Sequence, residues 1–374
     1  MSSEVAEGWQ EAALGELCHI AIGGTPSRDK PEYWAANGDG HPWVAISDMR
    51  EAVILRTKER ITDAGVENSN VKPVTAGTVM MSFKLTIGRV AIAGTDLFTN
   101  EAIAAFQPVA GIDKSFLPYW LEHIVANAET DQAIKGVTLN KKKLAALSGD
   151  LPPLDEQRRI AEVLQSVDQA IAAADAAQEA AQQVFIHVRA ELVEGARQCF
   201  DEIVVANAIA KNRGEKLIKL QTSDYQDAGA FPIIDQGASF ICGYTADQSA
   251  LWPYALPVIV FGDHTRILKF VDFPFAIGAD GTQCLTPRPD LDARFFYFAL
   301  QSLDLRGEGY ARHFKLLKEK TIPLPDMPTQ LEIANQLSAL EQSIAAAETA
   351  RQRLQQTKRA LMSDLLSGRV RVPA

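Results

Sequence analysis

The sequence predicts an α+β protein in which two α/β globules are separated by two long helices that form an antiparallel coiled coil with a pseudo-two-fold repeat. Three features predict this fold. Part of the first half of the chain recurs in the second half, the recurring segments have coiled-coil spacing, and the segments between them are rich in Gly, Pro, aromatic and β-branched residues. We therefore expect four parts, at residues 1–150, 151–199, 200–323 and 324–374.

The repeat relates residues 151–195 to residues 324–368 at a constant offset of 173, and 16 of the 45 aligned positions are identical. Both copies begin with Leu-Pro-x-x-x-x-Gln-x-x-Ile-Ala. Apolar or small residues then recur at alternating spacings of four and three, which is the seam of a coiled coil. Each copy should form one helix of about 40 residues, roughly 60 Å long.

The helix ends and the middle of the seam carry further signals. Thr329 with Glu332 fits a capping box, and Gly195 and Gly368 are expected to end the two helices. A polar residue interrupts the seam at the same repeat position in both copies, Gln178 and Arg351. In an antiparallel pair these two side chains would meet near the axis and set the register, or else both face solvent.

The segments 1–150 and 200–323 are predicted to be the globules. Short apolar runs at 78–81, 90–92 and 258–261 predict strands, and residues 116–126 and 294–303 predict short helices. Two similar globules joined by rigid rods suit a protein that contacts an extended partner at two points. DNA is the obvious candidate, because its major grooves recur about every 34–36 Å.

Composition excludes several classes of protein. Of 374 residues, 47% are apolar and 22% are charged, which indicates a globular chain. No apolar run of about 18 residues predicts a membrane span, and no basic, apolar leader predicts secretion. The four cysteines form no Cys-x-x-Cys pair, so we expect no disulfide framework, no metal site and a cytoplasmic location. The net charge of −10 argues against nucleic acid unless basic side chains gather locally.

Several motifs, taken in their order, resemble the specificity subunit of a type I restriction-modification system. The repeated Leu-Pro-x-x-x-x-Gln-x-x-Ile-Ala resembles the entry to the conserved regions of that family. The motifs of the first globule lie at 14–16, 23–27, 31–34, 42–43 and 47–49, and those of the second at 234–237, 243–245, 261–266, 278–282 and 310–314. The resemblance covers nearly the whole chain.

The resemblance implies a non-catalytic subunit without a cofactor. Such a subunit supplies DNA sequence specificity to two modification (adenine methyltransferase) subunits and, for cleavage, to ATP-driven restriction subunits. Each globule would be a target-recognition domain that reads one half of a bipartite site in double-stranded DNA, and the helical pair would set the unread gap. Because the two globules differ in sequence, an asymmetric site is expected.

The residues support the absence of catalysis independently. A methyltransferase needs a glycine-rich turn for the methyl donor and an Asn/Asp-Pro-Pro-aromatic loop for a flipped base, and neither is present. The sequence also lacks a Gly-x-x-x-x-Gly-Lys-Ser/Thr phosphate loop and a Gly-x-Ser-x-Gly nucleophile turn, and its six histidines show no metal-ligand spacing.

Two loops of the first globule are candidate DNA contacts. The Gly-Gly of loop 23–28 would let the backbone approach a phosphate, although an ordinary surface turn explains the loop equally well. The turn at 84–89 presents polar side chains between two predicted strands, which favours DNA contact. The candidate side chains are Thr25, Ser27, Arg28, Lys84, Thr86 and Arg89.

The second globule has an equivalent turn at 262–266, where arginine or lysine can reach guanine edges or phosphates. Asp263 in this turn either accepts a hydrogen bond from cytosine or orients Arg266. The candidate side chains are Gln236, Tyr244, His264, Thr265, Arg266 and Lys269.

A basic cluster precedes each long helix and answers the objection from net charge. The first cluster is Lys135, Lys141, Lys142 and Lys143, and the second is Arg312, His313, Lys315, Lys318 and Lys320. Residues 150–197 instead contain four Lys/Arg and nine Asp/Glu, a balance of 4 − 9 = −5. Basic charge therefore gathers in the globules, where phosphate contacts are expected, although solvated turns are the alternative. The alternative function is a coiled-coil scaffold with two ligand-binding globules and no role on DNA.

Overall fold

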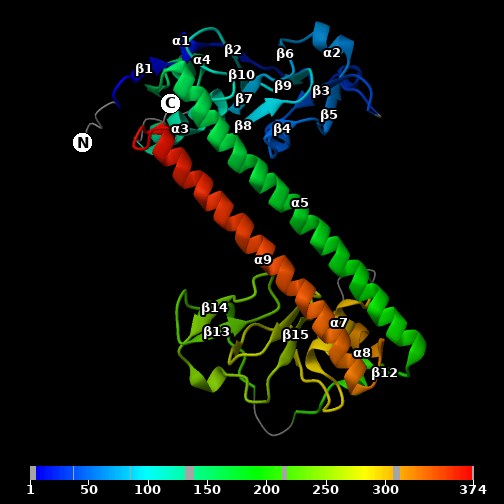
Figure 1. The fold of residues 1–374 in the computed structure, drawn as a ribbon. Coiled ribbons are helices and arrows are strands. Elements are labelled where there is room, and N and C mark those ends of the chain that lie inside the picture. The colour runs from blue at the N-terminus through cyan, green and yellow to red at the C-terminus, as the bar shows by residue number, and fades with distance from the viewer. Residues whose placement is uncertain are drawn as a thin grey trace. The chain divides into compact units, whose positions relative to one another are not determined.

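The computed structural model describes residues 6–36, 38–84, 86–130, 139–212, 217–305 and 312–372. By compactness the chain divides into unit 1, residues 1–173 and 351–374, and unit 2, residues 174–350. Each unit therefore contains one globule and half of each long helix. The α+β fold class is confirmed, and the two rods are α5 (Leu154–Cys199) and α9 (Met327–Leu366) (Figure 1).

Unit 1 contains a five-stranded sheet in the order β2-β10-β7-β8-β4, a four-stranded sheet in the order β5-β3-β9-β6, and the pair β1-β11. Its strands are β1 (Gln10–Ala13), β2 (Cys18–Ile22), β3 (His41–Val44), β4 (Val53–Ile54), β5 (Glu59–Ile61), β6 (Pro73–Val74), β7 (Val79–Ser82), β8 (Val90–Ala93), β9 (Leu97–Thr99), β10 (Ile103–Pro108) and β11 (Ser148–Leu151). Its short helices are α1 (Leu14–Leu17), α2 (Asp63–Glu67), α3 (Leu117–Thr130) and α4 (Lys141–Ala145).

The core of unit 1 has two main layers. Buried residues of α3, of the five-stranded sheet and of the ends of α5 and α9 form one cluster around Trp120 and Phe106, both 0% exposed. A second cluster, around Met80 and Val44, fills the space between the two sheets. The globule is thus packed on the long helices through α3.

Unit 2 contains two three-stranded sheets, β16-β15-β18 and β14-β13-β17, and the pair β12-β19. Its strands are β12 (Glu202–Val204), β13 (Phe231–Ile234), β14 (Gly243–Thr245), β15 (Val258–Gly262), β16 (Leu268–Val271), β17 (Ala276–Ile277), β18 (Thr282–Leu285) and β19 (Thr321–Pro323). Its short helices are α6 (Val205–Ala208), α7 (Ala293–Gln301) and α8 (His313–Glu319). The strands and helices predicted at 78–81, 90–92, 258–261, 116–126 and 294–303 are confirmed within a few residues.

The two globules share a topology although their sequences differ. In unit 1, β3 pairs in parallel with β9, and β7 is flanked by the antiparallel strands β8 and β10. In unit 2, β13 pairs in parallel with β17, and β15 is flanked by the antiparallel strands β16 and β18. Helices α3 and α4 of unit 1 follow the same order as α7 and α8 of unit 2. The internal repeat therefore extends through the globules, where sequence comparison alone showed it only weakly.

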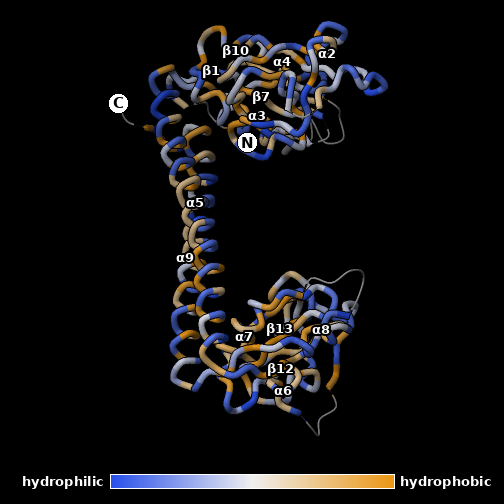
Figure 2. The backbone as a smooth tube through the Cα atoms, turned by 90° about the vertical axis from the view of Figure 1, so that its right-hand side faces the viewer, coloured by the Kyte–Doolittle hydropathy of each residue, from blue (hydrophilic) through white to orange (hydrophobic). Residues whose placement is uncertain are grey.

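The long helices are antiparallel within each unit. In unit 1, Leu164 near the start of α5 and Leu365 near the end of α9 belong to one buried cluster. In unit 2, Phe185 and Ala196 of α5 cluster with Leu337 of α9. Figure 2 shows polar and apolar residues alternating along both helices, as the seam requires. Among the polar seam residues, Gln178 lies in unit 2 and Arg351 in unit 1, so their predicted meeting stays a prediction.

Two predictions about helix ends are wrong. Asp326, not Thr329, caps α9, because its carboxylate accepts the amide of Thr329 at 3.1 Å. Gly195 lies inside α5, which continues to Cys199 because Ala196 is buried in the core of unit 2. Gly368 does follow the end of α9, with the positive φ of 69° that favours glycine there.

The glutamine of the repeated motif has the same role in both copies. Gln157 and Gln330 are 0% and 1% exposed. The amide nitrogen of Gln157 donates to the carbonyls of Gly111 and Pro152, at 2.9 and 2.8 Å, and its oxygen accepts the amide of Asp113 at 2.7 Å. Gln330 makes the equivalent bonds to Asp290, Pro325 and Asp292, at 3.0, 2.8 and 2.7 Å. Each glutamine thus fastens the start of a long helix to the loop before α3 or α7.

A carboxylate in unit 1 joins the two ends of the described chain. Glu156 is 3% exposed, and its oxygens accept from the guanidinium of Arg371 at 2.6 and 2.7 Å and from the indole of Trp9 at 3.1 Å. Burial opposes ionisation of Glu156, but these hydrogen bonds outweigh it and hold its pKa below the ordinary value. Residues near both ends of the chain are therefore fastened to the first turn of α5.

Replacing Glu156 with Gln should lower the free energy of unfolding of unit 1 by about 2 kcal/mol at pH 7, because Arg371 is 43% exposed and keeps part of its hydration. A lowered native pKa gives a stability contribution that is complete above about pH 5 and fades as the pH falls through the native pKa. The difference between parent and variant should therefore shrink in acid. Urea unfolding at pH 7 and below pH 4, with the exposed Glu162→Gln as control, measures it. An equal difference at both pH values would show that charge is not involved.

Candidate nucleic-acid interface

Three turns of unit 2 meet at one end of its strands, and we call residues 235–242, 263–267 and 278–281 loop platform 2. Gln236 joins all three. Its side-chain nitrogen donates to the carbonyl of Asp280 at 2.8 Å, its side-chain oxygen accepts the amide of His264 at 3.2 Å, and its carbonyl accepts the hydroxyl of Thr265 at 2.6 Å. Gln236, His264 and Thr265, predicted separately as DNA contacts, are thus brought together.

Asp263 attaches helix α8 to loop platform 2. This residue is 4% exposed, its carboxylate accepts the amide of Phe314 at 2.7 Å, and its carbonyl accepts the amide of His313 at 3.0 Å. Neither predicted role of Asp263, a contact to cytosine or the orientation of Arg266, describes these bonds. The carboxylate instead satisfies the free amides at the start of α8. The basic residues there, Arg312 and Lys315, are exposed beside the platform.

Arg266 lies at the tip of the turn between β15 and β16. Its φ of 61° is in the left-handed region, which is uncommon for a residue with a side chain. Its amide bonds to the carbonyl of Gly262 at 2.8 Å, and its exposed guanidinium donates to the carbonyl of Leu305 at 3.4 Å. Surrounding bonds thus hold the turn in a strained conformation, a pattern that clusters at functional sites.

Lys269 is buried, contrary to its prediction as a DNA contact. It is 4% exposed, and its ammonium donates to the carbonyls of Asp235, Ser239 and Phe240, at 2.8, 2.5 and 3.5 Å. These three carbonyls belong to the turn 235–242, so Lys269 holds that turn from beneath. A solvent-exposed lysine was expected because the sequence does not reveal which carbonyls face the side chain.

Two further predicted residues of unit 2 lie off the exposed turns. His313 is 7% exposed, at the first position of α8. Tyr244 is half-buried in β14, where its main chain pairs with Gln226. The burial of His313 contradicts its prediction as a DNA contact, whereas the DNA contact of Tyr244 stays a prediction.

Unit 1 has a related set of turns, which we call loop platform 1: residues 23–28, 83–84 with 86–89, and 100–101. The last two turns correspond in topology to 263–267 and 278–281 of unit 2, whereas 23–28 follows β2 and has no counterpart in loop platform 2. The hydroxyl of Thr25 donates to the carboxylate of Glu101, and the amide of Phe83 donates to the carbonyl of Ala102 at 2.9 Å. The hydrogen bond from Thr25 lowers the pKa of Glu101, although burial opposes it, and the charge of Lys84 adds to the lowering. Thr25, Lys84 and Glu101 therefore form one polar cluster.

The remaining predicted side chains of this turn set are exposed. Thr86 and Arg89 lie on the turn between β7 and β8, and Arg89 donates to the carbonyl of Ile46 at 3.5 Å. Ser27 is exposed, and its carbonyl accepts the indole of Trp34 at 3.2 Å.

Arg28 is held in place rather than free. Its guanidinium forms a two-pronged ion pair with Glu59 and lies 3.7 Å from the ring centre of Trp34. The hydrogen bond from Arg28 lowers the pKa of Glu59, so the pair is charged at neutral pH. Stacking and pairing fix the guanidinium on the surface, which limits the conformational entropy that it gives up when it meets a ligand.

The glycines of loop 23–28 have an internal role. Both are buried, and a Cβ on Gly23 would lie 2.2 Å from the carbonyl oxygen of Thr99. The prediction that Gly-Gly opens the backbone to a phosphate is therefore wrong. The missing side chains let the loop pack against the end of β9 instead.

The first basic cluster lies on α4, whose Lys141, Lys142 and Lys143 are all exposed. Asn140 caps this helix by accepting the amide of Lys143 at 2.9 Å. Helix α4 occupies the place in unit 1 that α8 occupies in unit 2. Lys135 and residues 310–311 of the motif at 310–314 lie outside the described residues.

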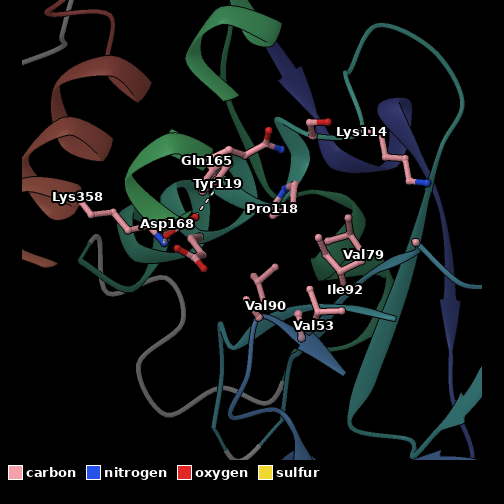
Figure 3. Close-up of a pocket in the computed structure, with 15 residues that line it drawn as sticks. Val53, Val79, Val90, Ile92, Lys114, Pro118, Tyr119, Gln165, Asp168 and Lys358 are labelled. Carbon is pink, nitrogen blue, oxygen red and sulfur yellow. Dashed lines mark hydrogen bonds and ion pairs between the residues drawn. The ribbon is translucent and has the colours of Figure 1, made fainter. Parts of the chain in front are cut away.

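A separate pocket of about 460 Å³ lies between the globule of unit 1 and its helices (Figure 3). Val53, Val79, Val90 and Ile92 line one side. On the other side, Asp168 accepts the hydroxyl of Tyr119 at 2.7 Å and pairs with Lys358 at 2.6 Å, which ties α3, α5 and α9 together. An apolar wall and a carboxylate, that of Asp168, do not suit the binding of phosphate, because neither can donate a hydrogen bond to it.

The described residues offer little reactive chemistry. Burial raises the pKa of the Cys18 and Cys284 thiols to about 12, so neither is a thiolate at neutral pH. In the described ranges, no group of three His, Cys, Asp or Glu residues is arranged to hold a metal ion. No helix in those ranges combines the length and apolar character that a membrane span requires.

Comparison with known proteins agrees with the motifs and the topology. The family model described as the type I restriction modification DNA specificity domain matches residues 6–181, the globule of unit 1 and the first part of α5. Residues 6–181, just under half of the chain, are thus similar to the DNA specificity domain of type I restriction-modification systems.

Two curated specificity subunits of type I restriction enzymes align with part of the chain. The one from Methanocaldococcus jannaschii is 27% identical over 179 residues, which are 45% of this chain and 40% of that protein. The one from Escherichia coli is 27% identical over 166 residues, which are 41% of this chain and 40% of that protein. The matched region thus spans less than half the length of either relative.

The crystal structure of a type I system S subunit from M. genitalium has the same fold. It superposes with a TM-score of 0.60 at 16% identity and covers 98% of both chains. The likeness in fold therefore extends over the part of this chain that the family model leaves unmatched.

Sequence reasoning missed several residues of the two platforms. Glu59 and Glu101 were overlooked because an acidic residue is not expected at a DNA surface. Phe240 and Ile241, on the turn above Lys269, were overlooked because exposed apolar side chains carry no charge signal. Two features of the sequence could have indicated these residues. One is an acidic residue close to basic residues, and the other is a pair of neighbouring apolar residues within a polar turn.

Proposed function

We propose that the chain is the non-catalytic DNA-reading subunit of a type I restriction-modification complex. Loop platform 1 would read one half of a bipartite site in double-stranded DNA, and loop platform 2 would read the other. The observation that carries the proposal is the pair of turn sets, which share two topologically equivalent turns and each lie in a unit that also exposes a basic helix start. The match of residues 6–181 to the specificity-domain family model supports it, and the scaffold alternative leaves both basic turn sets unexplained.

The charge distribution fits this function despite a net charge of −10. Exposed basic residues lie on the turns and on α4 and α8, whereas residues 150–197, mostly α5, have a balance of 4 − 9 = −5. Lysine and arginine contacts to phosphate set register and affinity, and side chains on the turns read base edges. Because the turns differ in sequence between the units, we propose that the two half-sites differ.

The same proposal includes the partners. Two modification (adenine methyltransferase) subunits, one for each unit, fit the duplicated topology, and ATP-dependent restriction subunits would join for cleavage in the cytoplasm. The chain itself would supply no cofactor chemistry. We propose that the two long helices set the unread gap between the half-sites.

Exchange of one globule tests the proposal. Residues 200–323 are replaced with the second globule of another specificity subunit, and the chimera is expressed with the proposed modification subunits. Methylated adenines are then mapped across the host genome. One half of the methylated motif should change and the other half should stay. Loss of any defined motif in the parent complex, or a change in both halves in the chimera, would overturn the assignment.

A further inference from the structure

The turn 235–242 of loop platform 2 exposes two large apolar side chains at its tip. Phe240 is 46% exposed and Ile241 is 38% exposed, on the connection between β13 and β14. The ring centre of Phe240 lies 6.1 Å from that of the half-buried Phe273. The ring of Phe240 is thus supported by Phe273, and both apolar side chains are exposed to solvent.

Buried polar groups hold this turn rigid. Lys269 binds three of its carbonyls, as described above, and its ammonium lies 4.0 Å from the carboxylate of Asp235. That carboxylate is 9% exposed and accepts from the amide of Gly237 at 2.7 Å, the thiol of Cys242 at 2.6 Å and the hydroxyl of Tyr225 at 3.0 Å. Burying an ammonium and a carboxylate is unfavourable unless both are fully bonded. This bonded cluster makes the backbone beneath the two apolar side chains stiff.

The apolar tip lies beside the basic surface. Gln236, in the same turn, binds His264 and Thr265 of the neighbouring turn, and that turn holds α8 through Asp263. The rigid apolar tip belongs to the same loop platform as the exposed Arg266, and Arg312 is exposed at the start of the attached α8. Apolar and cationic groups on one surface are complementary to a base step flanked by phosphates. Proteins that kink DNA insert Phe, Ile or Leu between neighbouring base pairs in this way.

We propose that Phe240, supported by Phe273, inserts into a base step of the DNA bound by unit 2, partly unstacks it and bends the duplex. This inference rests on the proposed function. Insertion is easiest at flexible pyrimidine–purine steps, so the tip would select sequence through deformability rather than through hydrogen bonds to base edges. Lys269 and Asp235 are then positioning residues that keep the wedge extended.

The test compares Phe240→Ser and Phe240→Leu with Phe200→Ser, a matched change at a residue of unit 2 that is 36% exposed after the end of α5. Each full-length variant is assembled with the modification subunits and bound to a duplex that carries the methylated motif of the parent. One readout is energy transfer between dyes at the two duplex ends, and another is the fluorescence of 2-aminopurine placed at successive steps. Urea unfolding checks that the variants fold.

We expect the parent complex to bend the duplex and to raise 2-aminopurine fluorescence at one step of one half-site. Phe240→Ser should abolish both signals and weaken binding about ten-fold, as removal of stacking on one base does. Phe240→Leu should keep part of the bend, and Phe200→Ser should match the parent.

Each of the following outcomes would overturn the wedge. Phe240→Ser could bend DNA as the parent does, or it could lose its modification subunits while the bend survives, which would make the tip a protein-docking site. A parent complex that binds no defined DNA would remove the proposed function and the wedge with it. Normal binding by the parent with no effect of Phe240→Ser would remove the wedge alone.

Discussion

Reversing the charges of Lys141, Lys142 and Lys143 together, by replacing each with Glu, is expected to lower the affinity of the complex for its DNA site on the order of 100-fold at about 0.15 M salt. All three side chains are exposed on α4, so their replacement should leave the core of unit 1 intact. Each lysine that meets a phosphate releases about 0.9 counterions, which is worth roughly five-fold in affinity at this salt concentration. The factors for three such lysines multiply to about 100-fold, which is the expected loss of affinity.

The slope of log affinity against log salt should fall by about 0.9 for each phosphate that the variant no longer neutralises, so a salt titration by fluorescence anisotropy tests the mechanism as well as the size of the effect. Lys114→Glu is the matched control, because Lys114 is exposed in the same unit but lines the pocket beside α3 and α5. The control should stay within about two-fold of the parent. Weaker binding with an unchanged salt slope would mean that α4 does not meet phosphate.

Replacing Gln157 with Leu should lower the free energy of unfolding of unit 1 by about 3 kcal/mol, because the two carbonyls and the amide that the buried side chain binds all lose their partner. The leucine fills a similar volume, so the destabilisation measures hydrogen bonding rather than a cavity. Gln330→Leu should destabilise unit 2 by a similar amount, since its three bonds are equivalent. Urea unfolding of the full chain measures both variants.

Gln356→Leu is the control for this pair, because Gln356 is exposed on α9. It should change the free energy of unfolding by no more than about 0.5 kcal/mol. The effects of Gln157→Leu and Gln330→Leu should add in the double variant, since the two residues lie in different units. A variant as stable as the control would show that water replaces the amide at no cost, and would rule out the fastening role.

Much of the fold could be predicted from local pattern. The repeat at an offset of 173 and the four-three apolar spacing located both long helices, because a helix that buries one stripe must repeat its apolar residues at the helical period. Gly195 shows the limit of this reasoning. A glycine near a helix end resembles a stop signal, but burial of the neighbouring Ala196 in unit 2 favours continuing the helix.

The candidate site was predicted only in part. The turns that carry Thr25, Lys84, Gln236 and Arg266 were found because polar residues between apolar strands mark exposed turns. Their grouping into two platforms was not visible, because each platform joins turns that are far apart in the chain. The acidic partners Glu59 and Glu101 became apparent only through their bonds with Arg28 and Thr25.

By itself, the sequence determined where the long helices and strands lie, that the chain is duplicated, and which turns carry basic residues. Each of these features depends on the pattern of residues along the chain. Only the tertiary structure decided what individual charges do. Lys269 and Arg266 are both basic residues near one turn, yet the first is enclosed by carbonyls of the turn 235–242 and the second is exposed. The physical reason is that the environment of a charged group depends on burial and on bonding partners, and distant segments of the chain supply both.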